Sequence, residues 1–241
     1  MPVPARPGGG SLRAMKRSLV PCLVALAACG GSEVAEPEPV QTETGGEDTA
    51  PVEVEPPPPP MRTTVPVPVP QPAVAREQLS MELQAVWDAV ERVVHVRAPE
   101  PPEEASEEAI NAWADGPFAE WFTRRRTEME RLGTEVATLA QRSPPPHEVI
   151  IAAALLGYAY EDMAAGVRGA PIPEALAADQ ELLAIYVNAL TEATRPIAQE
   201  ATRGYAHCVR VFSENDDGAW AEWGQYCDDR GAEVVEVFGL Q

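Results

Sequence analysis

The sequence predicts an all-α protein, a compact bundle of about six helices behind a disordered, proline-rich segment. From residue 74 onward, apolar residues recur every three or four positions, as on one face of a helix, and no segment alternates like a half-buried strand. Residues 30 to 72, by contrast, contain twelve prolines, eight acids and one base. We therefore divide the chain into residues 1–28, 29–73 and 74–241.

The first segment, residues 1–28, has the organisation of a signal sequence. A short basic stretch that begins at Met15 is followed by an apolar run from Leu19 to Ala28. This run is too short to cross a bilayer, which takes about 20 apolar residues, but it has the length of a signal-peptide core. Since the signal is complete without residues 1–14, we expect Met15 to be the true start.

The end of this run, Leu26-Ala27-Ala28-Cys29, resembles the lipobox of bacterial lipoproteins. The resemblance implies cleavage before Cys29, a diacylglyceryl group on its sulfur and an acyl group on its new amine. Two or more acyl chains hold a protein stably on a membrane, whereas one holds it only marginally. Gly30 stands where an aspartate would signal inner-membrane retention, so the resemblance implies an outer-membrane lipoprotein that faces the periplasm, with surface exposure as an alternative. The other interpretation is a secretory signal with a chance cysteine.

The second segment, residues 29–73, is expected to be an extended, disordered tether. Proline lacks an amide hydrogen and fixes φ, so neither a helix nor a central strand forms through Pro56 to Pro60 or the alternating run from Val65 to Pro70. At about 3.1 Å per residue, such a chain reaches on the order of 100 Å. We interpret it as a spacer, and a docking site for a proline-recognising partner is the alternative.

The charge excludes a nucleic-acid partner. The formal charge is −20, and removal of residues 1–28, which hold four bases and no acid, lowers it to −24. Such a surface repels nucleic acids and anionic lipid head groups.

In the third segment, residues 74–241, prolines and glycines separate the expected helices. The first helix is predicted to end near Ala98, before a group of prolines. A short helix over residues 104–114 is predicted to end before Gly116-Pro117. A longer one, from residue 118 to about 141, is followed by three consecutive prolines.

Residues 149–160 are apolar without interruption, which predicts a central helix surrounded by the others. We interpret the acids that follow, Glu161 and Asp162, as the point where this helix reaches the solvent. Residues 174–212 are predicted to form one kinked or two successive helices, because Pro196 removes an amide hydrogen bond.

The last helix is predicted over residues 219–238, after a turn at Ser213 to Gly218. The stretch from Ala189 to Arg230, which spans this turn, is similar to a C-terminal helical pair in envelope lipoproteins of gliding soil bacteria. The residues that carry this resemblance are Arg195, Pro196, Tyr205, Cys208, Trp220, Trp223 and Cys227. No activity follows from it.

The run Leu156-Gly157-Tyr158-Ala159-Tyr160 resembles the core of the first helix of a tetratricopeptide repeat. This resemblance implies a TPR-like arrangement of helices. No second copy occurs at the repeat's period, however, and we interpret Gly157 as a point where two helices approach closely.

A disulfide between Cys208 and Cys227 is predicted. Cys22 leaves with the signal and Cys29 is acylated, so these two remain in an oxidising compartment. A fold-back at the turn before the last helix places both on facing apolar stripes, and a loop of this length contributes about 3 kcal/mol. The alternatives are two free buried thiols or a zinc site formed with His207 and Asp228. We predict neither a metal nor another cofactor, apart from the covalent lipid on Cys29.

The basic cluster Arg124-Arg125-Arg126 offers two interpretations. Arg125 is in phase with Phe122 and Met129, towards the core, and a buried arginine needs a carboxylate partner, so an internal ion pair is the first. The second is a recognition patch for an anionic partner.

No set of nucleophile, base and acid has catalytic spacing. The sequence therefore favours a non-catalytic, membrane-anchored envelope lipoprotein whose helical domain docks an envelope protein as a scaffold or assembly module. The alternatives are a hydrolase of envelope polymers and a small-ligand carrier with a cleft lined by Trp113, Trp121 and Tyr158.

Overall fold

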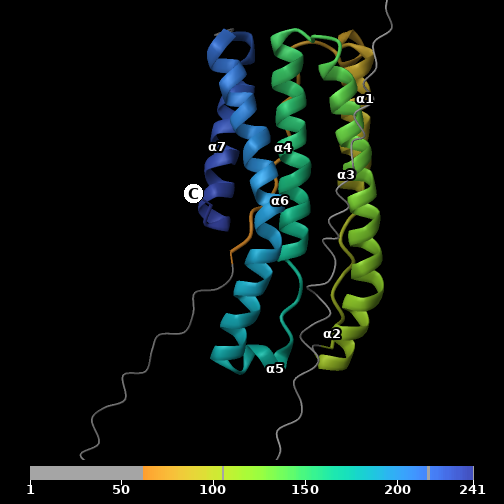
Figure 1. Cartoon of the computed structure of the whole chain (residues 1–241), viewed down its shortest axis with the longest axis vertical. Helices are drawn as coiled ribbons and strands as arrows, with labels where there is room; N and C mark the ends of the chain where they lie inside the picture. Colours follow the sequence, from red (N-terminus) through yellow and green to blue (C-terminus); the bar gives the residue numbers. More distant parts are fainter. Residues whose placement is uncertain (1–61, 105, 216–217, 241) are drawn as a thin grey trace, which may run out of the picture. The chain divides into compact units, whose positions relative to one another are not determined.

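The computed structural model describes residues 62–104, 106–215 and 218–240, which belong to one compact unit (Figure 1). Within these ranges the chain is all-helical and contains no strand, which confirms the predicted fold class. The long helices are α1 (Met81–His95), α3 (Ala119–Ala140), α4 (Pro146–Arg168), α6 (Gln180–Asn215) and α7 (Ala221–Phe238). The short ones are α2 (Glu107–Trp113) and α5 (Glu174–Ala177), with single turns η2 (Arg76–Gln78), η3 (Ala114–Phe118) and η4 (Gly218–Trp220).

Helix α4 is the centre of the bundle, as its uninterrupted apolar sequence predicted. It packs against α6 over much of its length and also contacts α1, α3 and α7. By length and composition it is the one described helix that could cross a membrane, yet 61% of its apolar window is buried inside the bundle. This burial is typical of a core helix in a globular domain.

The close contact between α4 and α6 depends on two glycines. A Cβ atom on Gly157 would lie 2.7 Å from the ring of Tyr205, and one on Gly204 would lie 2.7 Å from the backbone nitrogen of Gly157. Neither position has room for a larger residue, so Gly157 serves close helix approach, as the sequence indicated.

The start of α1 is fixed to the start of α4 by hydrogen bonds. The hydroxyl of Ser80 caps α1 by accepting from the amide of Leu83. The carboxylate of Glu148, which is buried, accepts from both the amide and the hydroxyl of Ser80, at 2.9 and 2.8 Å. One carboxylate therefore sets the position of two helices.

Two helix boundaries differ from the sequence prediction. Gly116-Pro117 does not end a helix, because the chain passes through it in the π-helical turn η3 and continues directly into α3. This wider turn accommodates the missing amide hydrogen of Pro117. Helix α4 does not end near Tyr160 but continues to Arg168.

Residues 174–212 were predicted to form one kinked or two successive helices because of Pro196. They form the four-residue α5 and the 36-residue α6, which continues through Pro196 without a break.

The packed part of the chain also begins earlier than residue 74. Thr64 is 2% exposed, and Val69 and Val74 pack against the hydrophobic core. Thr64 and Val69 were expected to belong to the tether. They instead lie against the helices, while the signal, Cys29 and residues 29–61 of the expected tether fall outside the described residues.

Candidate docking surface and buried ion pairs

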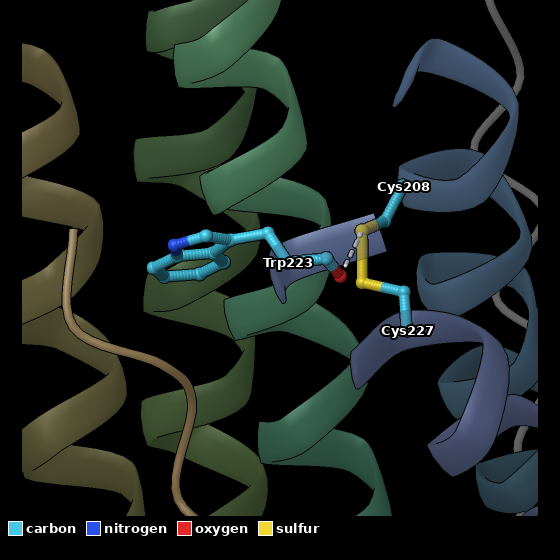
Figure 2. The surroundings of a disulfide bond; sticks show 3 residues. All are labelled: Cys208, Trp223 and Cys227. Carbon is cyan, nitrogen blue, oxygen red and sulfur yellow. Dashed lines mark hydrogen bonds between the residues drawn. A yellow bond between two sulfur atoms is a disulfide. The ribbon is translucent and has the colours of Figure 1, made fainter. Parts of the chain in front are cut away.

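The predicted disulfide joins α6 to α7. Cys208 and Cys227 are bonded, with their Cα atoms 6.2 Å apart, and both are fully buried (Figure 2). The sulfur of Cys208 lies 3.7 Å from the carbonyl oxygen of Trp223. Since a disulfide sulfur carries no hydrogen, we regard this as a packing contact. Across the described ranges, no three His, Cys, Asp or Glu side chains lie together as a metal site would require.

The three consecutive arginines do not form one surface patch. Arg125 is 1% exposed and pairs with Asp162, and its guanidinium also donates to the carbonyls of Val93 and, at 2.9 Å, Val96. Burial lowers the pKa of Arg125, and the carboxylate of Asp162 opposes this shift. The internal ion pair predicted for this residue is therefore present.

A recognition patch of all three arginines is consequently wrong. Only Arg124 and Arg126 lie at the surface, and Arg126 already faces Glu130 at 3.9 Å. Because the side chain of Arg125 lies in the core, these three arginines do not form a continuous basic surface.

Glu161 is not the solvent end of a helix, as the sequence suggested, but the centre of a buried polar cluster. Its carboxylate is fully buried on α4 and pairs with Arg230 of α7. It also accepts a hydrogen bond of 2.6 Å from the hydroxyl of Tyr205 on α6. Side chains from three helices thus satisfy one buried charge, which a carboxylate in this position requires.

Burial keeps the two tyrosines of this cluster protonated. Burial raises the pKa of Tyr205, and the neighbouring Tyr226 and Glu161 raise it further. Burial also raises the pKa of Tyr226, whose ring packs edge-on against Tyr205 with centroids 6.0 Å apart. Every charged or polar group here is paired with a group of the same cluster or with backbone, which is the pattern of a structural ion pair.

The proposed ligand cleft of Trp113, Trp121 and Tyr158 is filled by packing. Both indoles are buried, and their N–H groups donate to the carbonyls of Glu100 and Val96, each at 2.8 Å. Phe118 lies between the two rings, with centroid distances of 4.6 and 5.1 Å.

Two shallow pockets lie elsewhere, and neither is lined by these aromatic residues. The first, of about 390 Å³, is lined by Gln71, Pro72, Ala73, Val74, Ala75, Arg76, Trp87 and Glu91. The second, of about 190 Å³, is lined by Pro146, His147, Ile150, Phe212, Asn215 and Trp220.

The N-terminal half of α6, residues 180–193, carries apolar side chains that the described chain leaves uncovered. Not one residue of this stretch is buried. Leu182 and Ile185 are 45% and 51% exposed. The exposed apolar residues follow each other at spacings of three and four, so they lie along one side of the helix. We call them the outer stripe of α6, formed by Leu182, Ile185, Ala189 and Ala193.

The adjacent side of this half, about 100° around the helix, is also apolar but only half-buried. It is formed by Leu183, Tyr186, Val187 and Leu190. The hydroxyl of Tyr186 donates to the carbonyl of Pro171 at 3.2 Å, which ties the helix to the loop before α5. A helix with so wide an apolar surface normally packs against others over all of it. Among the described residues, the outer stripe has no such cover.

Helix length explains why the outer stripe is uncovered. Helix α6 has 36 residues, whereas its neighbours α4 and α7 have 23 and 18. Figure 1 shows that the lower part of α6, with α5 at its end, extends beyond the ends of both neighbours. The first residue of α6 that is buried is Thr194.

The edge of the outer stripe is acidic. Asp179, Glu181 and Glu192 lie at its two ends, and no basic residue occurs between them. Asp179 also caps α6, because its carboxylate accepts from the amides of Glu181 and Leu182 at 3.0 and 3.1 Å. Glu192 at the far end already pairs with Arg195, Nη2 to Oε1 at 2.6 Å. The negative charge that favours a partner of opposite charge therefore lies at the start of the stripe, at Asp179 and Glu181.

We compared the chain with models of known protein families, with curated proteins and with solved structures, and none of them matches it. The geometry of the described residues and the sequence motifs are therefore what supports a function.

Proposed function

We propose that this chain is a lipid-anchored protein of the bacterial cell envelope whose helical bundle binds another protein through the outer stripe of α6. The observation that carries this proposal is the uncovered apolar side of α6 over residues 180–193. Full burial of an exposed leucine or isoleucine contributes about 1.5–3 kcal/mol. Leu182 and Ile185 are about half exposed, so a partner that covers both gains a part of that energy from each.

The chemistry of the surface indicates the kind of partner. A straight helical stripe of small and medium apolar residues fits an amphipathic helix laid alongside it. The acidic residues at its start, Asp179 and Glu181, favour basic residues at the corresponding edge of the partner. We therefore propose a helical partner protein with an apolar face and a basic edge.

A structural role for the buried polar cluster supports a binding function over a catalytic one. Glu161 and Arg230 satisfy each other inside the bundle, at 0% and 8% side-chain exposure. A general acid or base needs access to a substrate, and neither group has it in this arrangement.

The lipid anchor rests on the lipobox resemblance, and Cys29 lies outside the described residues. We expect Cys29→Ala to abolish incorporation of a palmitate analogue and to leave the signal uncleaved. Labelling of the variant at the level of the parent chain would contradict the anchor, although it would leave the docking surface untouched.

The docking surface can be tested by site-specific photo-crosslinking in the cell. We expect a photoreactive amino acid at Ile185 to give one discrete product with another protein, whose crosslinked peptide is an amphipathic helix with basic residues. The control position is Ala206, which is exposed on the C-terminal half of the same helix and should give no such product. A product with a second copy of this chain, a product with lipid alone, or equal products from both positions would contradict the proposed partner.

A further inference from the structure

The segment that precedes the helices is held by two hydrogen-bond donors of α7. The side-chain Nη2 of Arg230 donates to the carbonyl of Val65 at 3.2 Å. The hydroxyl of Tyr226 donates to the carbonyl of Val67 at 2.8 Å. Thr64, next to these residues, is 2% exposed. Residues 64–69, which we call the strap, therefore lie against α7 through their backbone.

The two donors contact backbone atoms of the strap. Two of its three valines lie outside, and the third, Val69, packs against the core. Val65 is 74% exposed and Val67 is 46% exposed. The strap contains two prolines, Pro66 and Pro68, which have no amide hydrogen to offer. An extended proline-rich chain therefore has many hydrogen-bond acceptors and few donors. The two α7 side chains that contact the strap both act as donors and so match it.

The two donors are positioned by contacts with residues outside the strap. The guanidinium of Arg230 is fixed by Glu161 and by Glu233, and the ring of Tyr226 packs against Tyr205. Burial raises the pKa of Tyr226, so its hydroxyl remains a donor at neutral pH. A rigid donor pair of this kind binds an extended chain without the cost of ordering the site.

The strap is held by two hydrogen bonds, by the burial of Thr64 and by the packing of Val69 against the core. Each of its hydrogen bonds to α7 contributes little net free energy, because water replaces the lost bond when the strap leaves. Before the strap, Arg62 forms an ion pair with Glu236, in which both side chains are about two-thirds exposed. Exposed pairs contribute little. The helices do not depend on these contacts for their own hydrogen bonds.

We propose that Arg230 and Tyr226 form a docking site for extended proline-rich chain, which the strap of the same molecule occupies reversibly. Release of the strap moves the point at which the chain joins the helices from Thr64 to about Val74. Ten further residues then belong to the spacer, which lengthens its reach by about 30 Å in an extended proline-rich conformation. This site is on α7 and does not depend on the outer stripe of α6.

A peptide-binding measurement tests the site. The probe is a fluorescent peptide with the sequence of residues 63–70, added to the full chain and to a variant in which these residues are replaced by glycine and serine. We expect the peptide to bind the replaced variant, and to bind the unaltered chain at least tenfold more weakly because the strap competes. Tyr226→Phe in the replaced variant should weaken binding about fivefold to tenfold.

The matched control is Tyr186→Phe, which removes the same kind of tyrosine-to-carbonyl hydrogen bond at Pro171. It should leave peptide binding unchanged. Absence of binding to a replaced variant that retains its helical circular dichroism, or equal binding with and without the Tyr226 hydroxyl, would overturn the proposal.

A second measurement does not require the replaced variant to fold. In a chain without Cys22 and Cys29, the thiol introduced by Thr64→Cys reacts with a labelling reagent only when the strap is released, because Thr64 is buried. We expect labelling much faster than global unfolding, and about fivefold to tenfold faster still with Tyr226→Phe but not with Tyr186→Phe. Labelling at the rate of global unfolding, or a rate that Tyr226→Phe does not change, would overturn reversible docking.

Discussion

The two halves of α6 have similar apolar sequences and opposite surroundings. The C-terminal half, residues 194–215, lies between α4 and α7 and buries Thr194, Ala198, Ala201, Gly204, Tyr205, Cys208 and Val211. The N-terminal half, residues 180–193, buries none. Pro196, which cannot donate a backbone hydrogen bond, lies near the boundary between them. The comparison teaches that apolar periodicity predicts a helix, but it does not show whether other helices of the same chain bury its apolar side.

The largest expected effect on stability concerns residues 194–215 of α6, which we call the covered half; residues 180–193 are the uncovered half. Glu161→Ala removes the carboxylate that Arg230 and Tyr205 share and leaves the buried guanidinium with the more exposed Glu233 as its one ion-pair partner, so we expect a loss of about 3 kcal/mol in the free energy of unfolding. Chemical denaturation followed by circular dichroism measures it. The control is Glu214→Ala, which breaks the exposed pair with Arg210 and should cost less than about 0.5 kcal/mol. Similar losses in both variants would show that the buried cluster does not stabilise this half.

The close approach of α6 to α4 should be nearly as sensitive. Gly204→Ala places a methyl group 2.7 Å from the backbone of Gly157, and separating the helices should cost about 2–3 kcal/mol. Gly133→Ala is the matched control, because a Cβ atom there meets nothing within 4 Å. Because alanine favours a helix interior more than glycine does, this substitution should raise the free energy of unfolding by about 0.5–1 kcal/mol. If both substitutions shift the denaturation midpoint in the same direction, the contact between these helices is looser than described.

Alkaline pH should lower the free energy of unfolding through a buried tyrosine of the covered half. Burial raises the pKa of Tyr205 above its usual value of 10.0, and it faces Glu161, Arg230 and Tyr226. A raised folded-state pKa contributes stability below pH 10 that is lost as the pH rises further, at about 1 kcal/mol per pH unit for one group. Unfolding curves between pH 8 and 12 measure this slope. Tyr205→Phe should reduce the slope, and a slope that stays unchanged would show that Tyr205 ionises in the folded state as readily as in the unfolded state.

The smallest expected effect concerns the uncovered half. Ile185→Ala should change the free energy of unfolding by no more than about 0.5 kcal/mol, because the side chain is half exposed at the edge of the bundle. Val211→Ala in the covered half should cost about 1–2 kcal/mol, since Val211 is 8% exposed. Thermal and chemical unfolding of the two variants compare them directly. Equal losses would mean that both halves are covered alike.

The features that local sequence could predict are those that depend on neighbouring residues. Apolar spacing predicts the helices, proline groups predict most of their ends, and an arginine in phase with the core predicts its own ion pair, as found for Arg125. The disulfide was also predictable, because Cys208 and Cys227 lie at similar distances from one turn.

The features that sequence could not predict depend on residues far apart in the chain. Glu161 and Arg230 are separated by 69 positions, and an acid at the end of an apolar run resembles a helix end. The strap was missed for a different reason. Its contacts with α7 use backbone carbonyls, which give no signal in the side-chain pattern of Val65 and Val67.

The comparison of the two halves is tested most directly by hydrogen–deuterium exchange of the α6 backbone amides in the purified chain. Local opening of an uncovered helical stretch requires less free energy than opening of the core, and 1.4 kcal/mol corresponds to a factor of ten in exchange rate. We expect amides within residues 184–193 to exchange about a hundredfold faster than those within residues 198–211. Equal protection along the whole of α6 would contradict the existence of an uncovered half and would remove the surface on which partner binding is proposed.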